Sequence, residues 1–137
     1  MAQPSYLLDT NICIYIRQER PKAVLERFNR LPPGSTVISV VTYGELIYGV
    51  QRSPDPHKAM RILEELTTLI PVLPMAIEVA RTYGSIRAEL AARGELIGNN
   101  DLWIAAHAKS CGLTVVTNNE REFQRVEGLA VQNWAKG

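Results

Sequence analysis

The stretch YLLDTNICIYIR, residues 6–17, carries the pattern that decides the fold. A short apolar run, Tyr6–Leu8, stops at Asp9-Thr10-Asn11, whose side chains favour turns and helix caps. The amphipathic run Ile12–Arg17 follows directly. This order predicts a strand, a turn and a helix.

The same alternation continues along the chain. Further strands are expected at Thr36–Ser39, Leu113–Thr117 and Leu129–Val131, with a short edge strand within Pro71–Pro74. The helical patterns between them are Ala23–Leu31, Tyr43–Val50, Lys58–Leu69, Ala76–Arg93, Asp101–Cys111 and Glu120–Gln124. Strands that alternate with helices predict a mostly parallel sheet covered on both faces, a three-layer α/β/α sandwich. No repeat or linker is visible in residues 1–137, so we expect a single domain.

Composition excludes several classes of protein. The 137 residues include 15 Lys and Arg against 14 Asp and Glu, and 46% are hydrophobic, which is typical of a globular chain and not of a disordered one. The longest uncharged stretches contain proline and fall short of the roughly 18 to 20 apolar residues of a membrane span. Met1–Leu8 has no secretory pattern, so we expect a cytoplasmic protein with no membrane partner.

Cysteine and histidine usage gives little support to a zinc site. Cys13 and Cys111 form no CxxC motif and lie in apolar helical patterns, so both are expected to be reduced and packed as small hydrophobes. His57 and His107 stand far apart without ligand spacing.

Acidic and amide side chains follow the strands, at the edge where a parallel sheet binds ligands. Asp9 directly follows the first strand, Glu45 lies one to two turns past the second, and Asp101 opens a buried helix. The run Thr117-Asn118-Asn119 follows the strand near the C-terminus. We therefore expect these side chains to meet at one rim of the sheet.

Each acid also has a local structural role open to it. Asp9 can cap the first helix, and Glu45 stands three residues after Thr42, at the spacing of a capping box. Asp101 in a helical first turn complements the helix dipole. Three acids at the same rim in an apolar surround favour a shared function over three separate local ones.

Carboxylates held close together repel one another, so an ionised cluster needs a cation of high charge density. Oxygen ligands without neighbouring His or Cys favour Mg²⁺ or Mn²⁺ over Zn²⁺. The chemistry this predicts is phosphoryl transfer or phosphodiester hydrolysis, in which the metal polarises a phosphate oxygen and a carboxylate orients the attacking water.

Four stretches contain the candidate residues and their neighbours: LLDTN at 7–11, TYGEL at 42–46, IGNNDLWIAAHA at 97–108 and VTNN at 116–119. Together they resemble the PIN-domain ribonuclease toxins of the VapC family. The stretches occur in the family's order at compatible spacing, and the likeness runs from the first strand to Asn133-Trp134. The combination is specific, although no single stretch is.

The resemblance implies a PIN fold and a Mg²⁺- or Mn²⁺-dependent endoribonuclease, with Asp9, Glu45 and Asp101 as catalytic and metal-binding residues. It also implies a type II toxin–antitoxin pair, in which a small antitoxin blocks the site and alone carries the binding of promoter DNA. The toxin is expected to form a homodimer. The implied substrate is structured RNA, expected to be tRNA, with the anticodon loop of initiator tRNA as a candidate.

One departure from the family concerns the number of metals. Many members carry a fourth acid where this chain has Asn118 and Asn119, with Glu120 and Glu122 close behind. An amide adds no negative charge, so we expect one well-occupied metal and a second only with RNA bound.

Other candidate residues surround the acids. Thr10, Asn11 and Thr117 are expected to orient the carboxylates, with Asn118 and Asn119 at the weak fourth position, although turn and cap roles explain them equally well.

Basic and aromatic side chains are the candidates for RNA contact. Arg87, on the long helix, and Arg17 with Lys22 are candidate contacts to RNA phosphate, against the alternative of solvated helix faces. Trp103 is expected in the core more than on a base-stacking platform, and Trp134 fits either.

Rival classes differ at particular positions. Dehalogenase-like phosphatases need a second Asp where this chain has Asn11, and receiver-like signalling domains need a paired acid in the first loop and a Lys after the last strands. A PIN domain that only binds RNA or a partner stays open, and unchanged RNA in Mg²⁺ and Mn²⁺ would support it.

Overall fold

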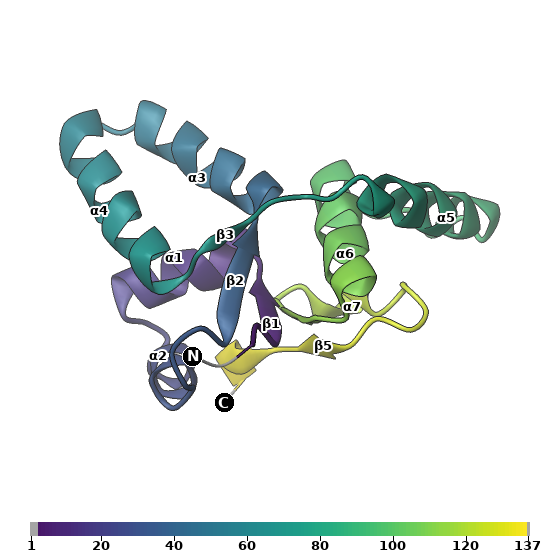
Figure 1. Ribbon diagram of the computed structural model, residues 1–137, viewed down its shortest axis with the longest axis horizontal. Helices are drawn as coiled ribbons and strands as arrows, with labels where there is room; N and C mark the ends of the chain where they lie inside the picture. The colour runs from purple at the N-terminus through teal and green to yellow at the C-terminus, as the bar shows by residue number, and fades with distance from the viewer. Residues whose placement is uncertain (1–2, 137) are drawn as a thin grey trace.

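The computed structural model describes residues 3–136 (Figure 1). The strands are β1 (Tyr6–Leu8), β2 (Thr36–Ser39), β3 (Val72–Leu73), β4 (Thr114–Val116) and β5 (Val131–Gln132). The helices are α1 (Thr10–Gln18), α2 (Lys22–Asn29), α3 (Val40–Gln51), α4 (Pro56–Leu69), α5 (Glu78–Ala92), α6 (Asn99–Cys111), α7 (Glu120–Phe123) and the 3₁₀ helix η1 (Trp134–Lys136).

The five strands form one parallel sheet in the order β3-β2-β1-β4-β5. The chain moves from β1 outward to β3, then returns to the other side of β1 with β4. This reversal is a topological switch point, where the connections of a parallel sheet leave a crevice outside the strands' carboxyl ends. Leu8 of β1 pairs with Val116 of β4, so the next residue of each strand, Asp9 and Thr117, reaches that crevice together.

Helices cover both faces of the sheet, as the sequence predicts (Figure 1). On one face Leu7, Val37 and Val115 pack against α5, α6 and α7. On the other, Leu8, Ile38 and Val116 pack against α1, α2, α3 and α4. Neighbouring strand residues therefore enter opposite cores, which is the three-layer α/β/α arrangement.

Helix α6 is the most deeply buried helix of the fold. Its buried residues are Leu102, Ile104, Ala105, Ala106, His107 and Ala108, which confirms the expectation drawn from its apolar sequence. Helix α5 crosses it and extends away from the sheet, with a narrow buried stripe of Val79, Ile86 and Leu90 (Figure 1).

The observed boundaries differ from the predicted ones at a few places. Helix α1 begins at Thr10, two residues earlier than predicted, because Asp9 supplies its cap. The last strand is Val131–Gln132 and not Leu129–Val131, since β5 pairs in register with Val115 and Val116. Among residues 3–136, no helix is long and apolar enough to cross a membrane.

Side-chain burial corrects two expectations, for Cys111 and Trp103, and decides between the two alternatives left open for Trp134. Cys13 is buried as predicted, but the prediction was wrong for Cys111, which is exposed where α6 reaches its C-terminus. Trp134 lies in the core, with its ring edge against Tyr6. Trp103 is only partly buried and stacks on Tyr83, so it is not a core residue in the sense expected.

Candidate active site at the switch point

Asp9 stands at the end of β1 and is buried. Its backbone N–H donates to the Val116 carbonyl at 3.0 Å, which ties the position to β4. Its Oδ1 accepts from the Ile12 N–H at 3.2 Å and its Oδ2 accepts from the Thr117 hydroxyl at 2.5 Å. Asp9 therefore does cap α1, as one interpretation held, and the structure also aims its carboxylate at the crevice between β1 and β4.

Glu45 lies on α3 and accepts its hydrogen bond from α1. The N-cap of α3 is Ser39, whose hydroxyl accepts from the Val41 N–H at 3.1 Å, so the capping-box alternative for Glu45 is wrong. Its Oε1 instead accepts from the Thr10 hydroxyl at 2.6 Å. This hydrogen bond joins α3 to the first residue of α1 and places Glu45 beside the Asp9 turn.

Asp101 lies in the first turn of α6 and is half-buried. Within the described residues, no hydrogen bond reaches its carboxylate from a protein donor. A Cβ built at Gly98 would lie 3.8 Å from Asp101 Oδ2, so the glycine leaves the carboxylate uncrowded. Its oxygens remain available to a ligand.

The acids shift one another's pKa values. Burial raises the pKa of Asp101 to about 6, and the charges of Asp9, Glu122 and Glu45 add to the effect. Burial also raises the pKa of Asp9, against the hydrogen bonds from Thr117 and the backbone, and Glu45 raises it further. Every charge that contributes at these two carboxylates is negative, so they form one electrostatic unit.

This donor set fits a hard divalent cation. No protein cation contributes to either shift, so the negative charge of the site is left for an external positive group. In residues 3–136, no three carboxylate, imidazole or thiol groups are close enough to bind one ion by themselves. Such a partial cage suits Mg²⁺, which keeps several waters and is bound through one or two carboxylates plus substrate phosphate.

The two asparagines that follow β4 contact residues of α1 and the end of β4. Asn118 donates to the Tyr15 hydroxyl at 2.7 Å, and its Oδ1 accepts weakly from Asn11 at 3.4 Å. Asn119 donates through its backbone N–H to the Thr117 hydroxyl at 2.9 Å. These contacts brace the Asp9–Thr117 pair. Tyr15 is a member of the site that sequence reasoning missed, because nothing in its helical position marks it.

The two acids that follow the asparagines separate in the structure. Glu120 forms an ion pair with Lys136 and accepts a hydrogen bond from Asn133, and the Lys136 contact lowers the pKa of Glu120. Glu122 instead acts on the pKa of Asp101. Glu122 is thus the acid that comes nearest to the missing fourth position.

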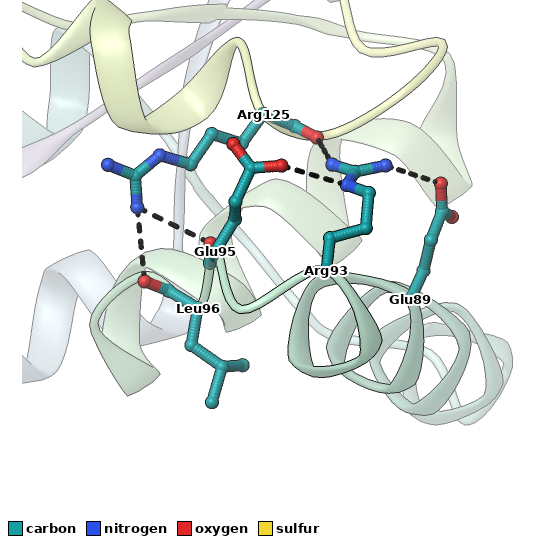
Figure 2. Close-up of polar contacts among 5 residues, drawn as sticks. All are labelled: Glu89, Arg93, Glu95, Leu96 and Arg125. Atoms are coloured by element: carbon teal, nitrogen blue, oxygen red, sulfur yellow. Dashed lines mark hydrogen bonds and ion pairs between the residues drawn. The ribbon is translucent and has the colours of Figure 1, made fainter.

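The loop that leads into α6 is fastened by two arginines (Figure 2). Arg93 binds Glu89, Glu95 and the Arg125 carbonyl at 2.9, 3.0 and 2.6 Å. Arg125 donates to the carbonyls of Glu95 and Leu96 at 3.3 and 3.2 Å. These bonds tie the start of the loop to the segment after α7 and so help to set where Gly98 and Asp101 begin the helix.

Arg87 belongs to a polar chain that reaches the start of α6. Its guanidinium donates to the Tyr83 hydroxyl at 2.8 Å, which in turn donates to Asn99 Oδ1 at 2.5 Å. The Tyr83 ring stacks on Trp103 with centroids 3.8 Å apart. Asn99 and Asp101 share the first turn of α6, so the polar chain links an exposed arginine to the helix that carries Asp101.

The two remaining basic candidates, Arg17 and Lys22, differ in whether they line the groove that contains Glu45. Arg17 lines a groove of about 730 Å³ between α1 and α3, together with Thr10, Glu45 and Asn100. Lys22 forms an exposed ion pair with Glu26 at 3.7 Å and does not line this groove. Contact of Lys22 with RNA stays a prediction without a geometric link to the acids.

A buried histidine supports the start of α3. His107 Nδ1 lies 2.9 Å from the hydroxyl of Ser39, the residue that caps α3. Burial lowers the pKa of His107, so the ring is neutral at pH 7. The pair links α6, which carries Asp101, to the helix that carries Glu45.

Comparison with known proteins identifies the class of protein to which this sheet, with acids at its switch point, belongs. The PIN-domain pattern matches residues 6–129. A tRNA(fMet)-specific endonuclease VapC from Shigella flexneri is 46% identical over 130 residues, covering 95% of this chain and 98% of that protein. Ribonuclease VapC2 from Haemophilus influenzae is 43% identical over 129 residues, covering 94% and 97%.

The same likeness holds in three dimensions. The solved structure of DNA-bound VapBC from Salmonella typhimurium superposes with a TM-score of 0.89 at 41% identity, covering 96% of this chain and 99% of that one. The chain belongs to the VapC family of PIN-domain ribonucleases.

Proposed function

We propose that this protein is the toxin of a type II toxin–antitoxin pair and a Mg²⁺- or Mn²⁺-dependent endoribonuclease that cleaves tRNA. The observation that carries the proposal is that Glu45 raises the pKa of Asp9, and that Asp9 and Glu45 raise the pKa of Asp101, with no protein cation among the causes. Three acids from separate segments therefore act as one electrostatic unit. Such a unit gains most from a divalent cation and a phosphate.

The protein's own groups hold this site in place. Thr117 and the Ile12 N–H fix both oxygens of Asp9, and Thr10 fixes one oxygen of Glu45. A metal held by one or two of these carboxylates would supply Lewis-acid polarisation of the phosphate and would lower the pKa of a water. Asp101 accepts no hydrogen bond from a protein donor among the described contacts, so a carboxylate oxygen of Asp101 that does not bind the metal would be free to orient a water as a base.

The residues that follow β4 decide the number of metals that we propose. Asn118 and Asn119 add no charge, and Glu122 is the acid that acts on Asp101. We assign one metal to this rim, bound directly by one or two of the carboxylates of Asp9, Glu45 and Asp101 and through water by the rest, and a second only when RNA phosphate completes its ligands.

Substrate and partners follow from the relatives. The Shigella relative is named for cleavage of tRNA(fMet), which makes initiator tRNA the first substrate to test, with its anticodon loop as the expected target. The Salmonella structure holds VapBC on DNA, so we assign this chain a small antitoxin that blocks its site and binds promoter DNA. A homodimer that acts in the cytoplasm, where tRNA is found, completes the proposal.

The test is cleavage of total RNA and of purified tRNA by the antitoxin-free protein, in Mg²⁺, in Mn²⁺ and in chelator. We expect discrete tRNA fragments with either metal and none in chelator. Fragments that persist in chelator would contradict the metal dependence. Unchanged RNA in both pools, with well-folded protein, would favour a PIN domain that only binds.

A further inference from the structure

We propose that the groove between α1 and α3 binds the RNA backbone on one side of the cleaved bond, with Arg17 and Arg52 as its phosphate-binding residues. This inference rests on the proposed nuclease function and extends it to how the substrate is positioned. Arg52, the residue that ends α3, is one that sequence reasoning missed.

The groove includes Glu45, one of the three acids of the site. Its lining includes Thr10 and Glu45, joined by their 2.6 Å hydrogen bond, and Asn100, the neighbour of Asp101. At about 730 Å³ it is large enough for several atoms of a polymer backbone. A strand bound at the acids can therefore continue into the groove without leaving the protein surface.

The two arginines stand at matching sequence positions from the two residues of the Thr10–Glu45 hydrogen bond. Arg17 follows Thr10 by seven residues along α1, and Arg52 follows Glu45 by seven residues along α3. Seven residues are two helical turns, or about 10.5 Å. A stacked RNA strand covers this in about three nucleotides at ~3.4 Å each, so the arginines meet phosphates near the cleaved one.

Both guanidinium groups are available to an anion. No carboxylate within residues 3–136 forms an ion pair with Arg17 or Arg52. Arg52 lies over the ring of Tyr48 at 4.7 Å, and that ring is 63% exposed and also lines the groove. An exposed aromatic beside unpaired arginines is the combination that single-stranded nucleic acid uses, with phosphates on the cations and bases on the ring.

Glycines keep the groove wall open. Gly44 and Gly49 lie inside α3 and line the groove, and a Cβ at either position would meet nothing within 4 Å. Glycine within a helix lowers its stability relative to alanine. Packing does not require these glycines, so close approach of a ligand backbone to α3 is the role left for them.

A simpler role for the arginines is electrostatic. Both stand at helix C-termini, where a cation complements the helix dipole. A role at the helix dipole does not require two arginines from different helices to line one groove. If it were their only role, replacing them would leave the affinity for RNA unchanged. A protein partner is the other occupant to test, but a cationic groove continuous with a phosphodiesterase site favours the polyanion.

The test measures how salt affects tRNA binding, in chelator to prevent cleavage. Log affinity falls as log salt rises, with a slope that is steeper when more phosphates are bound. The double variant Arg17→Gln and Arg52→Gln should make this slope shallower by about 1.5, and either change alone by about half of that. In Mg²⁺ the double variant should raise the KM for tRNA ten-fold or more with a smaller change in kcat, because these contacts exist before the transition state. The paired change to Lys should recover part of the affinity.

Two further variants distinguish binding in the groove from the general effect of losing a positive charge. Arg81→Gln, on α5 and outside the groove, should leave the salt slope and KM unchanged. Gly49→Leu should retain the fold, raise KM and leave the charge unaltered. A double arginine variant with the salt slope and KM of the unmutated protein would overturn the proposal.

The remaining outcomes are also decisive. If the double variant cleaves tRNA normally but escapes inhibition by the cognate antitoxin, the groove belongs to a protein partner and the inference is wrong. If the unmutated protein cleaves no RNA, the nuclease proposal fails by itself, and the salt slope in chelator still decides whether the groove binds RNA.

Discussion

Asp9, Glu45 and Asp101 differ in how far the protein itself satisfies their oxygens. Asp9 has a donor on each oxygen, Glu45 has one from Thr10, and Asp101 has none among the described contacts. The same Asp9 caps a helix and points into the crevice, so local and functional roles coincide in one side chain. The hydroxyls of Thr10 and Thr117 donate to these acids, so substitutions of the two threonines test the site as substitutions of the acids do.

Thr10→Val removes the donor to Glu45 while keeping the shape of the side chain. We expect kcat for tRNA cleavage to fall by about 10- to 100-fold, since groups that orient metal-binding carboxylates typically have effects of this size. Thr10→Ser, which retains the hydroxyl, should keep most of the activity. Equal kcat values for the valine and serine variants would show that the hydrogen bond does not position Glu45.

Asp101→Asn should stabilise the metal-free protein at neutral pH. The pKa of Asp101 is raised to about 6 in the folded state, so at higher pH its ionisation costs the folded state free energy relative to the unfolded state. The penalty disappears as the pH falls from about 6 toward 4, where the carboxyl is protonated in the folded state. We expect a gain of about 1 kcal/mol at pH 7.5 after solvent screening is allowed for.

Thermal unfolding in chelator between pH 4 and 8 measures this gain. The melting temperature of Asp101→Asn should exceed that of the unmutated protein by about 2–6 °C at pH 7.5 and match it near pH 4. In Mg²⁺ the difference should shrink, because the ion stabilises the protein that binds it. A variant less stable than the original at pH 7.5 in chelator would mean that Asp101 is not under charge repulsion.

Among the helices and strands, the sequence predicts those whose bounds are set by a local pattern of residues. Strand β2 is predicted to the residue because its β-branched run is bounded by Gly34 and a helix cap. The carboxyl ends of β1 and β4 were expected to meet because parallel strands share a rim, and Asp9 and Thr117 do meet. The three acids were predicted in this way, and Asp9 also serves as the cap of α1.

The sequence could not reveal contacts that depend on how separate elements meet. Tyr15, Glu122 and Arg52 reach the site or its groove only because α1, α7 and α3 converge there. Their residue types and spacing match ordinary helix surfaces. Lys22 and Arg17 look alike as a basic cluster in the sequence, but only Arg17 lines the groove.

Arg125→Ala tests whether the arginine pair positions the start of α6. It removes the bonds to the Glu95 and Leu96 carbonyls, so we expect faster hydrogen exchange across residues 94–98 and reduced cleavage. The loss in unfolding free energy should be only about 1 kcal/mol, because these bonds lie at the surface. Arg121→Ala, an exposed change on α7, is the control. Unchanged exchange and activity for Arg125→Ala would mean that the loop is fixed by other contacts.

At the scale of the whole molecule, the sheet separates two hydrophobic cores. Leu7 is buried against the α5–α6 side and Leu8 against the α1–α4 side, and neither side chain is exposed. The acids lie where both layers end, so the site depends on the layers keeping their places across β1.

Leu7→Ala and Leu8→Ala should each lower the unfolding free energy by about 2–5 kcal/mol, because each leaves a cavity in a different core. Urea denaturation measures both, with Val40→Ala as the control, since Val40 is 44% exposed and should change stability by about 0.5 kcal/mol or less. A large loss for one leucine and none for the other would contradict a fold built on two cores.

The most direct test of the account is single-turnover cleavage of purified initiator tRNA in Mg²⁺ by the unmutated protein and by Asp101→Asn, with equal folding confirmed by circular dichroism. The account predicts discrete fragments from the unmutated protein, and none from the variant over the same time. Cleavage by Asp101→Asn at the original rate would contradict the assignment of the acidic rim as the active site.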